Sequence, residues 1–211
     1  MASVESHEEQ PAPTAKRTAI QAAVLSATED LLAEGASYSD LNIERIAKRA
    51  GISRTAFYFY FRDKRELLMR LTAEVNELLY RQADIWFSGA GEPEPEMREA
   101  LTNIAALYAE HGVLLRAIVE VSTYDEEVAQ FWRGMVGRFV DASRRRIELE
   151  QQAGRTVVEH PQATSFALCW MIERAFNQQL VLGEPFREQA LVDALTGIFL
   201  RAVYGANGRP A

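Results

Sequence analysis

Apolar residues recur at intervals of three and four along almost the whole chain, which is the period of an amphipathic helix. We find neither the strict alternation of a half-buried strand nor an internal repeat. The pattern therefore predicts an all-α protein. We expect helices over residues 18–34, 43–50, 54–61, 63–86, 97–112, 113–121, 125–152, 161–182 and 185–204.

The sharpest local pattern lies between residues 41 and 68, where two short helices are predicted on either side of a tight turn. Asn42 precedes the first helix and Ser53 precedes the second, and both side chains are good N-caps. Gly51 follows the first helix, where a residue of left-handed conformation ends a helix at least cost. The two helices are therefore expected to form the corner of a helix-turn-helix unit.

The second short helix carries side chains suited to duplex DNA. Its first turn presents Arg54 and Thr55, whose guanidinium and methyl groups match guanine and thymine in the major groove. Phe57 and Phe61 are four residues apart and are expected to face inward, which leaves Tyr58 free to meet a phosphate. A helical corner that only packs is the alternative. The candidate DNA-binding residues are Asn42, Ser53, Arg54, Thr55, Tyr58, Tyr60 and Lys64.

The long helix that follows is predicted to begin with a capping box, in which Asp63 caps the helix and Glu66 reaches back. Lys64 would be its first residue. There the ammonium group and the free backbone N–H groups are expected to hold a phosphate together.

The net charge of −7 looks unfavourable for a DNA-binding protein until it is divided along the chain. Residues 16–70 contain ten basic and seven acidic residues, a net charge of +3, while the acidity lies in the preceding tail and in the residues from 71 onward. Attraction to phosphate depends on local charge, so the predicted DNA-binding segment is basic enough for its role.

The composition, 48% hydrophobic and 25% charged over 211 residues, suits a soluble protein of one large or two small domains. We expect no membrane-spanning helix and no secretory signal, because no apolar run is long enough. Cys169 is the single cysteine, which allows no internal disulfide and favours the cytoplasm. The sequence predicts neither a metal site nor a cofactor.

The helices from residue 86 onward carry many aromatic residues on their inward faces, beginning with Trp86 and Phe87. Core packing is the better explanation for each residue taken singly, but together they suit a cavity for a small apolar ligand. Glu173 is expected to be partly buried among them and to need a partner, either Arg174 or a ligand donor. The candidate ligand-binding residues are Met97, Ile104, Tyr108, Trp132, Val136, Phe139, Cys169, Ile172, Glu173 and Phe199.

Three short runs occur together in the predicted DNA-binding segment: Ile46-Ala47, Ala50-Gly51-Ile52-Ser53 and Phe57-Tyr58-Phe59-Tyr60-Phe61. This combination resembles the N-terminal domain of TetR-family transcriptional regulators, and the resemblance covers roughly residues 16–70. It implies a three-helix helix-turn-helix domain joined by a long helix to a C-terminal ligand-binding and dimerisation domain. It also implies dimers that pair through a four-helix bundle.

Residues 97–205 are similar to the EthR-like repressors of mycobacteria within that family, on the run Met171-x-Glu173-Arg174 and the ending Val203-Tyr204-Gly205. The resemblance implies an apolar tunnel for ligands. This chain has Cys169 and Ile172 where those repressors have a pair of asparagines, and Phe139 and Phe199 replace two tunnel tryptophans. These departures leave the identity of the ligand open.

The last two predicted helices carry more apolar surface than one buried side needs, so we expect them to pack against a second copy. Such a dimer would set two recognition helices about 34–36 Å apart, the spacing of successive major grooves. The expected organisation is a disordered tail over 1–15, a helix-turn-helix domain over 16–62, a ligand-binding and dimerisation domain over 63–205 and a tail over 206–211.

The sequence thus predicts a cytoplasmic DNA-binding regulator, a repressor released from double-stranded operator DNA by a small apolar ligand. Two other functions were weighed. An enzyme is disfavoured because the three histidines are scattered and none of the HExxH, CxxC, GxSxG or GxGxxG motifs occurs. An interaction adaptor that has lost DNA binding is disfavoured by the intact Arg54, Tyr58 and Lys64.

Overall fold

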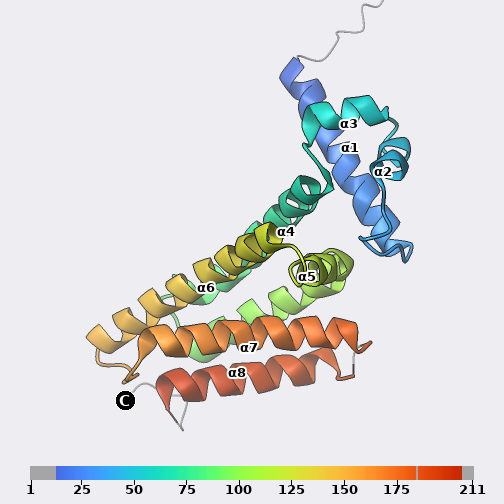
Figure 1. Cartoon of the computed structure of the whole chain (residues 1–211). Coiled ribbons are helices and arrows are strands. Elements are labelled where there is room, and N and C mark those ends of the chain that lie inside the picture. Colours follow the sequence, from blue (N-terminus) through green and yellow to red (C-terminus); the bar gives the residue numbers. More distant parts are fainter. Residues whose placement is uncertain (1–12, 184, 206–211) are drawn as a thin grey trace, which may run out of the picture. The chain divides into compact units, whose positions relative to one another are not determined.

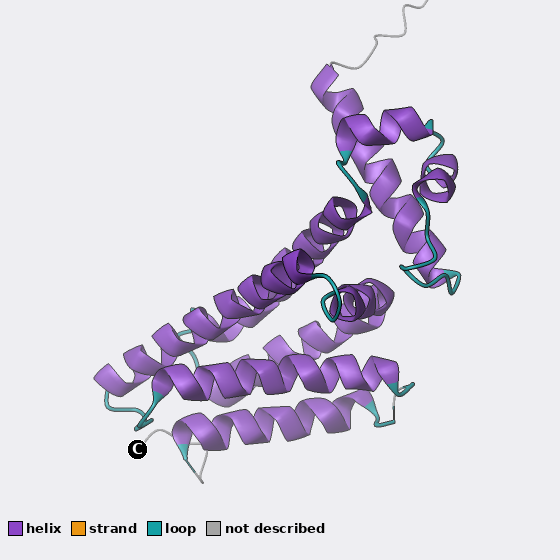
Figure 2. Cartoon of the chain, in the orientation of Figure 1, coloured by secondary structure: helices purple, strands orange, loops and turns teal. Residues whose placement is uncertain are grey.

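The structure is a computed structural model that describes residues 13–183 and 185–205. Every regular element within these ranges is a helix, which confirms the predicted all-α fold (Figures 1 and 2). The helices are α1 (Pro13–Ala33), α2 (Ile43–Arg49), α3 (Arg54–Tyr60), α4 (Lys64–Phe87), α5 (Pro93–Val121), α6 (Glu126–Gln152), α7 (Pro161–Val181) and α8 (Glu188–Tyr204).

Two predicted helix starts were too late. Helix α1 begins at Pro13 instead of residue 18, so the last part of the predicted tail 1–15 is helical, and residues 1–12 and 206–211 lie outside the described residues. Helix α5 begins at Pro93, inside a segment that we took for a loop. Proline lacks the N–H that the first helical residues leave unpaired, so both prolines start a helix where the sequence suggested a break.

Helix α5 also joins two segments that were predicted as separate helices. It continues through a kink at His111, where φ is −108° and ψ is 16°. The neighbouring Gly112 lies against the α7 residue Leu180, and a Cβ atom at this glycine would come within 2.9 Å of the leucine side chain. A close helix approach, rather than a helix end, therefore explains the glycine.

The described chain divides into two compact units, with the division between Leu67 and Leu68 inside α4. In the first unit α2 packs against both α1 and α3. Its core includes Leu31, Ile46, Phe57 and Phe61, each at most 2% exposed. The predicted inward pair is confirmed, since the rings of Phe57 and Phe61 lie 5.3 Å apart.

In the second unit α5 packs against α6, α7 and α8, while α6 also packs along α7. Trp86 near the end of α4 is 1% exposed, and its ring meets that of Phe199 in α8 edge to face, at 4.8 Å. Arg146 of α6 lies 5.6 Å from the Trp86 ring and donates to the carbonyl oxygen of Gly89. An ion pair of 2.7 Å joins Arg146 to Glu150, and both side chains are buried.

Candidate functional sites

The corner between α2 and α3 is built by local hydrogen bonds. The Asn42 side chain accepts a bond of 2.8 Å from the Arg45 N–H, and the Ser53 hydroxyl accepts one of 3.0 Å from the Ala56 N–H. Gly51 has a φ of 69°, and the next N–H, of Ile52, donates 3.0 Å to the Ala47 carbonyl. These contacts confirm the predicted caps. They also leave the Asn42 amide N–H groups and the Ser53 O–H available as donors.

One face of α3 is exposed and chemically varied. Arg54 and Thr55 are exposed, Tyr58 is 47% exposed, and Phe57 on the opposite face is fully buried. Sequence reasoning overlooked Phe59, which is 76% exposed and lies four residues after Thr55. A large apolar ring that the fold leaves in solvent needs a functional explanation more than a buried one does. Tyr60 lies on another side of the helix and is half-buried.

Lys64 is the first residue of α4, as predicted, but its ammonium group has other partners than the sequence suggested. Its ammonium group donates to the carbonyl oxygens of Tyr38 at 2.7 Å, Ser39 at 3.1 Å and Leu41 at 2.8 Å, and it lies 4.8 Å from the centre of the Tyr38 ring. Burial lowers the pKa of Lys64. An ammonium group has three donors, and all three are used here. These bonds do not support the predicted phosphate contact by this side chain, because Lys64 uses its donors to fasten the loop before α2 to the start of α4.

The first turn of α4 shows the predicted cap. Asp63 accepts a bond of 2.8 Å from the Glu66 N–H, as expected of an N-cap carboxylate. The Glu66 carboxylate reaches back one residue further than predicted, and accepts 2.7 Å from the Arg62 N–H.

The basic residues of the first unit differ in their surroundings. Arg49 is paired with Glu34 at 2.8 Å, and this hydrogen-bonded pair raises the pKa of the arginine. Arg45, Lys48 and Arg54 are exposed and make no ion pair with any residue that the structure describes. These three cations are the ones that remain available to phosphates near the corner.

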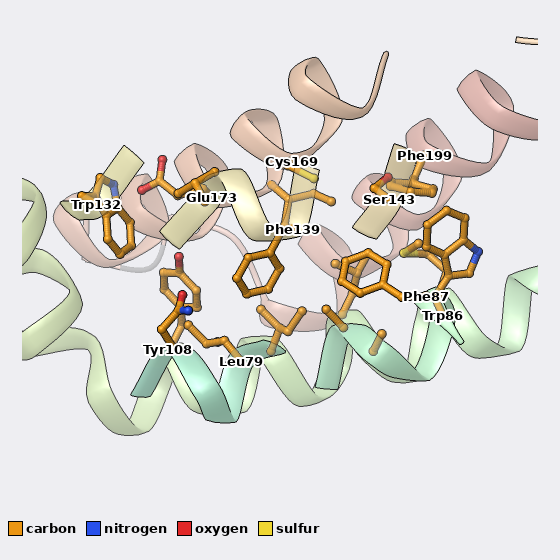
Figure 3. A pocket seen from close by; sticks show the side chains of 18 residues that line it. Leu79, Trp86, Phe87, Tyr108, Trp132, Phe139, Ser143, Cys169, Glu173 and Phe199 are labelled. Atoms are coloured by element: carbon orange, nitrogen blue, oxygen red, sulfur yellow. The ribbon is translucent and has the colours of Figure 1, made fainter. Parts of the chain in front are cut away.

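The second unit contains an apolar cavity of about 90 Å³. Side chains from α4, α5, α6, α7 and α8 line it, and Figure 3 shows them converging. All ten residues that the sequence suggested for a ligand line this one cavity. Trp86 and Phe87 also line it, as their place among the inward aromatic residues suggested. The sequence did not suggest the residues that complete the wall, Asn76, Leu79, Ala83, Ala100, Leu101 and Ser143.

The two ends of the cavity differ in chemistry. Trp86, Phe87 and Phe199 form an aromatic end, whereas Glu173 lies with Tyr108 and Trp132 at the other end (Figure 3). Near that second end the ring of Tyr108 stacks on Phe176, with ring centres 5.2 Å apart. A molecule that fills the cavity lengthwise would therefore meet rings at one end and a carboxyl group at the other.

Glu173 is buried without a hydrogen bond. It is 7% exposed, and neither carboxyl oxygen has a hydrogen-bond partner. Desolvation raises the pKa of Glu173, and the cationic Arg174 opposes that rise only in part. The Arg174 Nε atom lies 3.7 Å from Oε2, and its side chain is 51% exposed. The expected contact with Arg174 thus exists, but it leaves the carboxyl group without a donor.

Cys169 lies in the middle of the cavity wall (Figure 3). Burial raises the pKa of its thiol to about 12, so the reactive thiolate is scarce at neutral pH. The thiol is therefore a wall element and not a nucleophile.

Helices α7 and α8 lie side by side and leave large apolar side chains exposed (Figure 1). Phe166 and Val181 of α7 are 56% and 50% exposed, and Ile198 of α8 is 40% exposed.

Among the helices that the structure describes, none combines the length and the hydropathy that a membrane-spanning segment requires.

Helix-turn-helix geometry in one unit and an apolar cavity in the other together define a class of DNA-binding regulator. Comparison with known proteins supports that class. The family described as "Bacterial regulatory proteins, tetR family" matches residues 24–71, and "Transcriptional regulator EthR, C-terminal domain" matches residues 97–205. The chain belongs to the TetR family of bacterial transcriptional regulators.

The regulator EthR of Mycolicibacterium smegmatis is 30% identical over 194 residues, covering 88% of this chain and 86% of that protein. Among solved structures, NalD, a repressor of a multidrug efflux pump in Pseudomonas aeruginosa, has a TM-score of 0.71 at 19% identity, covering 90% of this chain and 98% of NalD. FadR of Bacillus subtilis in complex with stearoyl-CoA also has a TM-score of 0.71, at 15% identity, and covers 88% and 98%. The two structures show that the fold is shared.

Proposed function

We propose that this regulator is a repressor that a small apolar ligand releases from its operator. One observation carries the proposal: α4 begins in the helix-turn-helix unit at Lys64, and its later residues, from Asn76 to Phe87, form part of the cavity wall. A ligand that displaces this wall acts on a helix that is covalently continuous with the DNA-binding unit. NalD, which has the same fold, is itself a repressor.

The size of the cavity favours a ligand that opens it. About 90 Å³ is far below the roughly 300–1,000 Å³ of typical small-molecule sites. A bound ligand must therefore push wall residues such as Leu79 and Phe87 of α4 outward. Because the ligand prefers the opened state, it shifts the population of the protein toward that state.

DNA binding would use the exposed face of α3. Arg54 and Thr55 are proposed to contact base edges, and Tyr58 to contact a phosphate. Phe59 has the chemistry for the methyl group of thymine. Asn42, Ser53 and Tyr60 are proposed as further phosphate donors, whereas Lys64 is not, because its donors are used within the unit.

Pairing of two copies would cover the exposed side chains of α7 and α8. A two-fold dimer would place two α3 helices against successive major grooves, and half-sites would then lie about 34–36 Å apart. As a regulator of transcription the protein would act in the cytoplasm. The matched family and its relatives are regulators, so neither catalysis nor an adaptor role is proposed.

Sequencing the genomic DNA fragments that the protein binds would identify the operator. Fluorescence anisotropy would then measure the affinity of the protein for that operator. Tyr58→Ala should weaken binding to any duplex, whereas Arg54→Ala should cost discrimination of about 1–3 kcal/mol at one base pair. The control is Arg133→Ala, because Arg133 forms an exposed ion pair with Glu126 in the second unit. Unchanged binding in both α3 variants would contradict the proposed surface.

A further inference from the structure

The polar end of the cavity carries a specific ligand requirement. Glu173 is more than nine-tenths buried, lines the cavity and has two carboxyl oxygens without hydrogen-bond partners. Buried polar groups in proteins are almost always hydrogen-bonded, and an unpaired buried charge is costlier still. A carboxyl group kept in this state indicates that its partner arrives from outside the chain.

The neighbours of Glu173 narrow the chemistry of that partner. Tyr108 and Trp132 lie at the same end of the cavity, and the ammonium form of an amine is attracted to the faces of such rings (Figure 3). An ionised carboxylate only accepts hydrogen bonds, and an ammonium group only donates them. An organic cation thus satisfies the carboxylate and the rings together, whereas a fatty acid would bring a second carboxylate against Glu173.

The rest of the wall determines the remainder of the molecule. From Leu79 and Phe139 in the middle to Phe199 at the far end, the labelled side chains are apolar apart from Cys169 and the hydroxyl of Ser143, so the body of the ligand must be largely apolar (Figure 3). Asn76 adds an amide whose Nδ2 atom is also buried and unpartnered. An amide can offer either a donor or an acceptor, so it tolerates one polar atom on the ligand.

We propose that the cavity selects hydrophobic amines, with the ammonium group on Glu173 between Tyr108 and Trp132 and the apolar body directed toward Phe199. This inference rests on the proposed function, since it assigns the ligand class of the same cavity. It adds the requirement that the ligand be a cation. The nearby Arg174 does not fulfil that role, because it is half exposed and makes no hydrogen bond to Glu173.

The test measures binding to the full chain in the absence of DNA. Octylamine, octan-1-ol and octanoate share one apolar body and differ in the head group, and isothermal titration calorimetry gives their dissociation constants. We expect octylamine to bind most tightly and octanoate most weakly. Glu173→Gln keeps the shape but removes the charge, and should weaken octylamine binding by about thirtyfold or more while leaving octan-1-ol unchanged.

The matched control is Glu99→Gln, which removes the charge of an exposed glutamate on α5 and should alter no affinity. The proposal is overturned if octylamine does not bind, if octan-1-ol or octanoate binds as tightly, or if Glu173→Gln binds octylamine like the unaltered chain. Circular dichroism of Glu173→Gln verifies that the variant is folded.

A separate titration of operator release keeps the two proposals distinguishable. If octylamine binds through Glu173 but does not release the operator, the amine site stands and the repressor mechanism fails. If octan-1-ol releases the operator without any preference for the amine, the mechanism stands and the amine site fails.

Discussion

Lys64 in the first unit and Glu173 in the second are both largely withdrawn from solvent, and their surroundings differ. In the first unit the ammonium group of Lys64 donates hydrogen bonds to the carbonyl oxygens of Tyr38, Ser39 and Leu41. In the second unit Glu173 is more deeply buried, and both of its oxygens remain without a hydrogen bond. The hydrogen bonds of Lys64 stabilise the first unit, whereas we infer that Glu173 receives its partner from a ligand. A buried charge therefore indicates function when its own chain leaves it unsatisfied.

The packing of the two units shows the same contrast. Phe57 fills the small core of the first unit and is fully buried, while Phe139 borders the cavity and is partly accessible. Phe57→Ala should lower the free energy of unfolding by about 3–5 kcal/mol, because it leaves a hole in a close-packed core. Phe139→Ala enlarges a space that already exists and should cost roughly half as much. Urea denaturation of both variants measures the two free energies of unfolding. Equal losses would contradict the proposed difference in packing between the two units.

Lys64→Met tests whether that lysine is structural. The methionine keeps most of the length of the side chain but leaves three carbonyl oxygens without the lysine donors, so the free energy of unfolding should fall by about 2–3 kcal/mol. The dependence of DNA affinity on salt should stay unchanged, because no phosphate contact is lost. A salt slope smaller by about one, with unchanged stability, would restore the phosphate role.

Glu173→Gln should make the protein more stable at high pH. Desolvation raises the pKa of Glu173 in the folded chain, so the folded state holds a proton that the unfolded state releases. The stability from this group is complete below the unfolded pKa and is lost as the pH rises through the folded pKa. The variant should thus have a larger free energy of unfolding than the original chain at pH 8 and an equal one at pH 3. Thermal unfolding of the variant and the original chain at pH 8 and pH 3 measures this difference. A variant that is less stable at pH 8 would show that Glu173 has a partner.

The Cys169 thiol should react only slowly with maleimide while the chain is folded. A thiol whose pKa is raised to about 12 should react with maleimide about three orders of magnitude more slowly than a free cysteine at pH 7. Mass spectrometry before and after unfolding in urea measures this difference. Rapid labelling of the folded chain would show that the cavity wall opens to solvent.

Sequence could predict the contacts that are made within a few residues. The caps by Asn42 and Ser53, the left-handed Gly51 and the inward pair of Phe57 and Phe61 depend on spacings of three or four, and all are observed. The ten residues proposed for the ligand could be chosen because each lies on the apolar side of its own helix or matches the EthR-like pattern. Their convergence on one cavity required the coordinates.

Contacts between segments that are distant in sequence could not be predicted from the local pattern of apolar and polar residues. Lys64 finds its partners 23 to 26 residues earlier, in a loop without periodicity, so its place at a helix start suggested a phosphate instead. Leu79 of α4 was missed because an apolar residue at helical spacing reads equally well as part of a packing stripe, and Asn76 was missed because it is polar. Pro13 and Pro93 looked like breaks because a proline both starts helices and interrupts them.

The central claim is that occupation of the cavity and operator binding exclude one another through α4. Ala83→Phe tests it directly, because Ala83 lies on α4 and lines the cavity, so the added ring takes the place of a ligand. The control Glu74→Phe adds the same ring at an exposed position of α4. With circular dichroism verifying that both variants are folded, fluorescence anisotropy should show Ala83→Phe binding the operator at least about tenfold more weakly than the original chain, and Glu74→Phe binding it equally well. An unchanged operator affinity in folded Ala83→Phe would contradict the account.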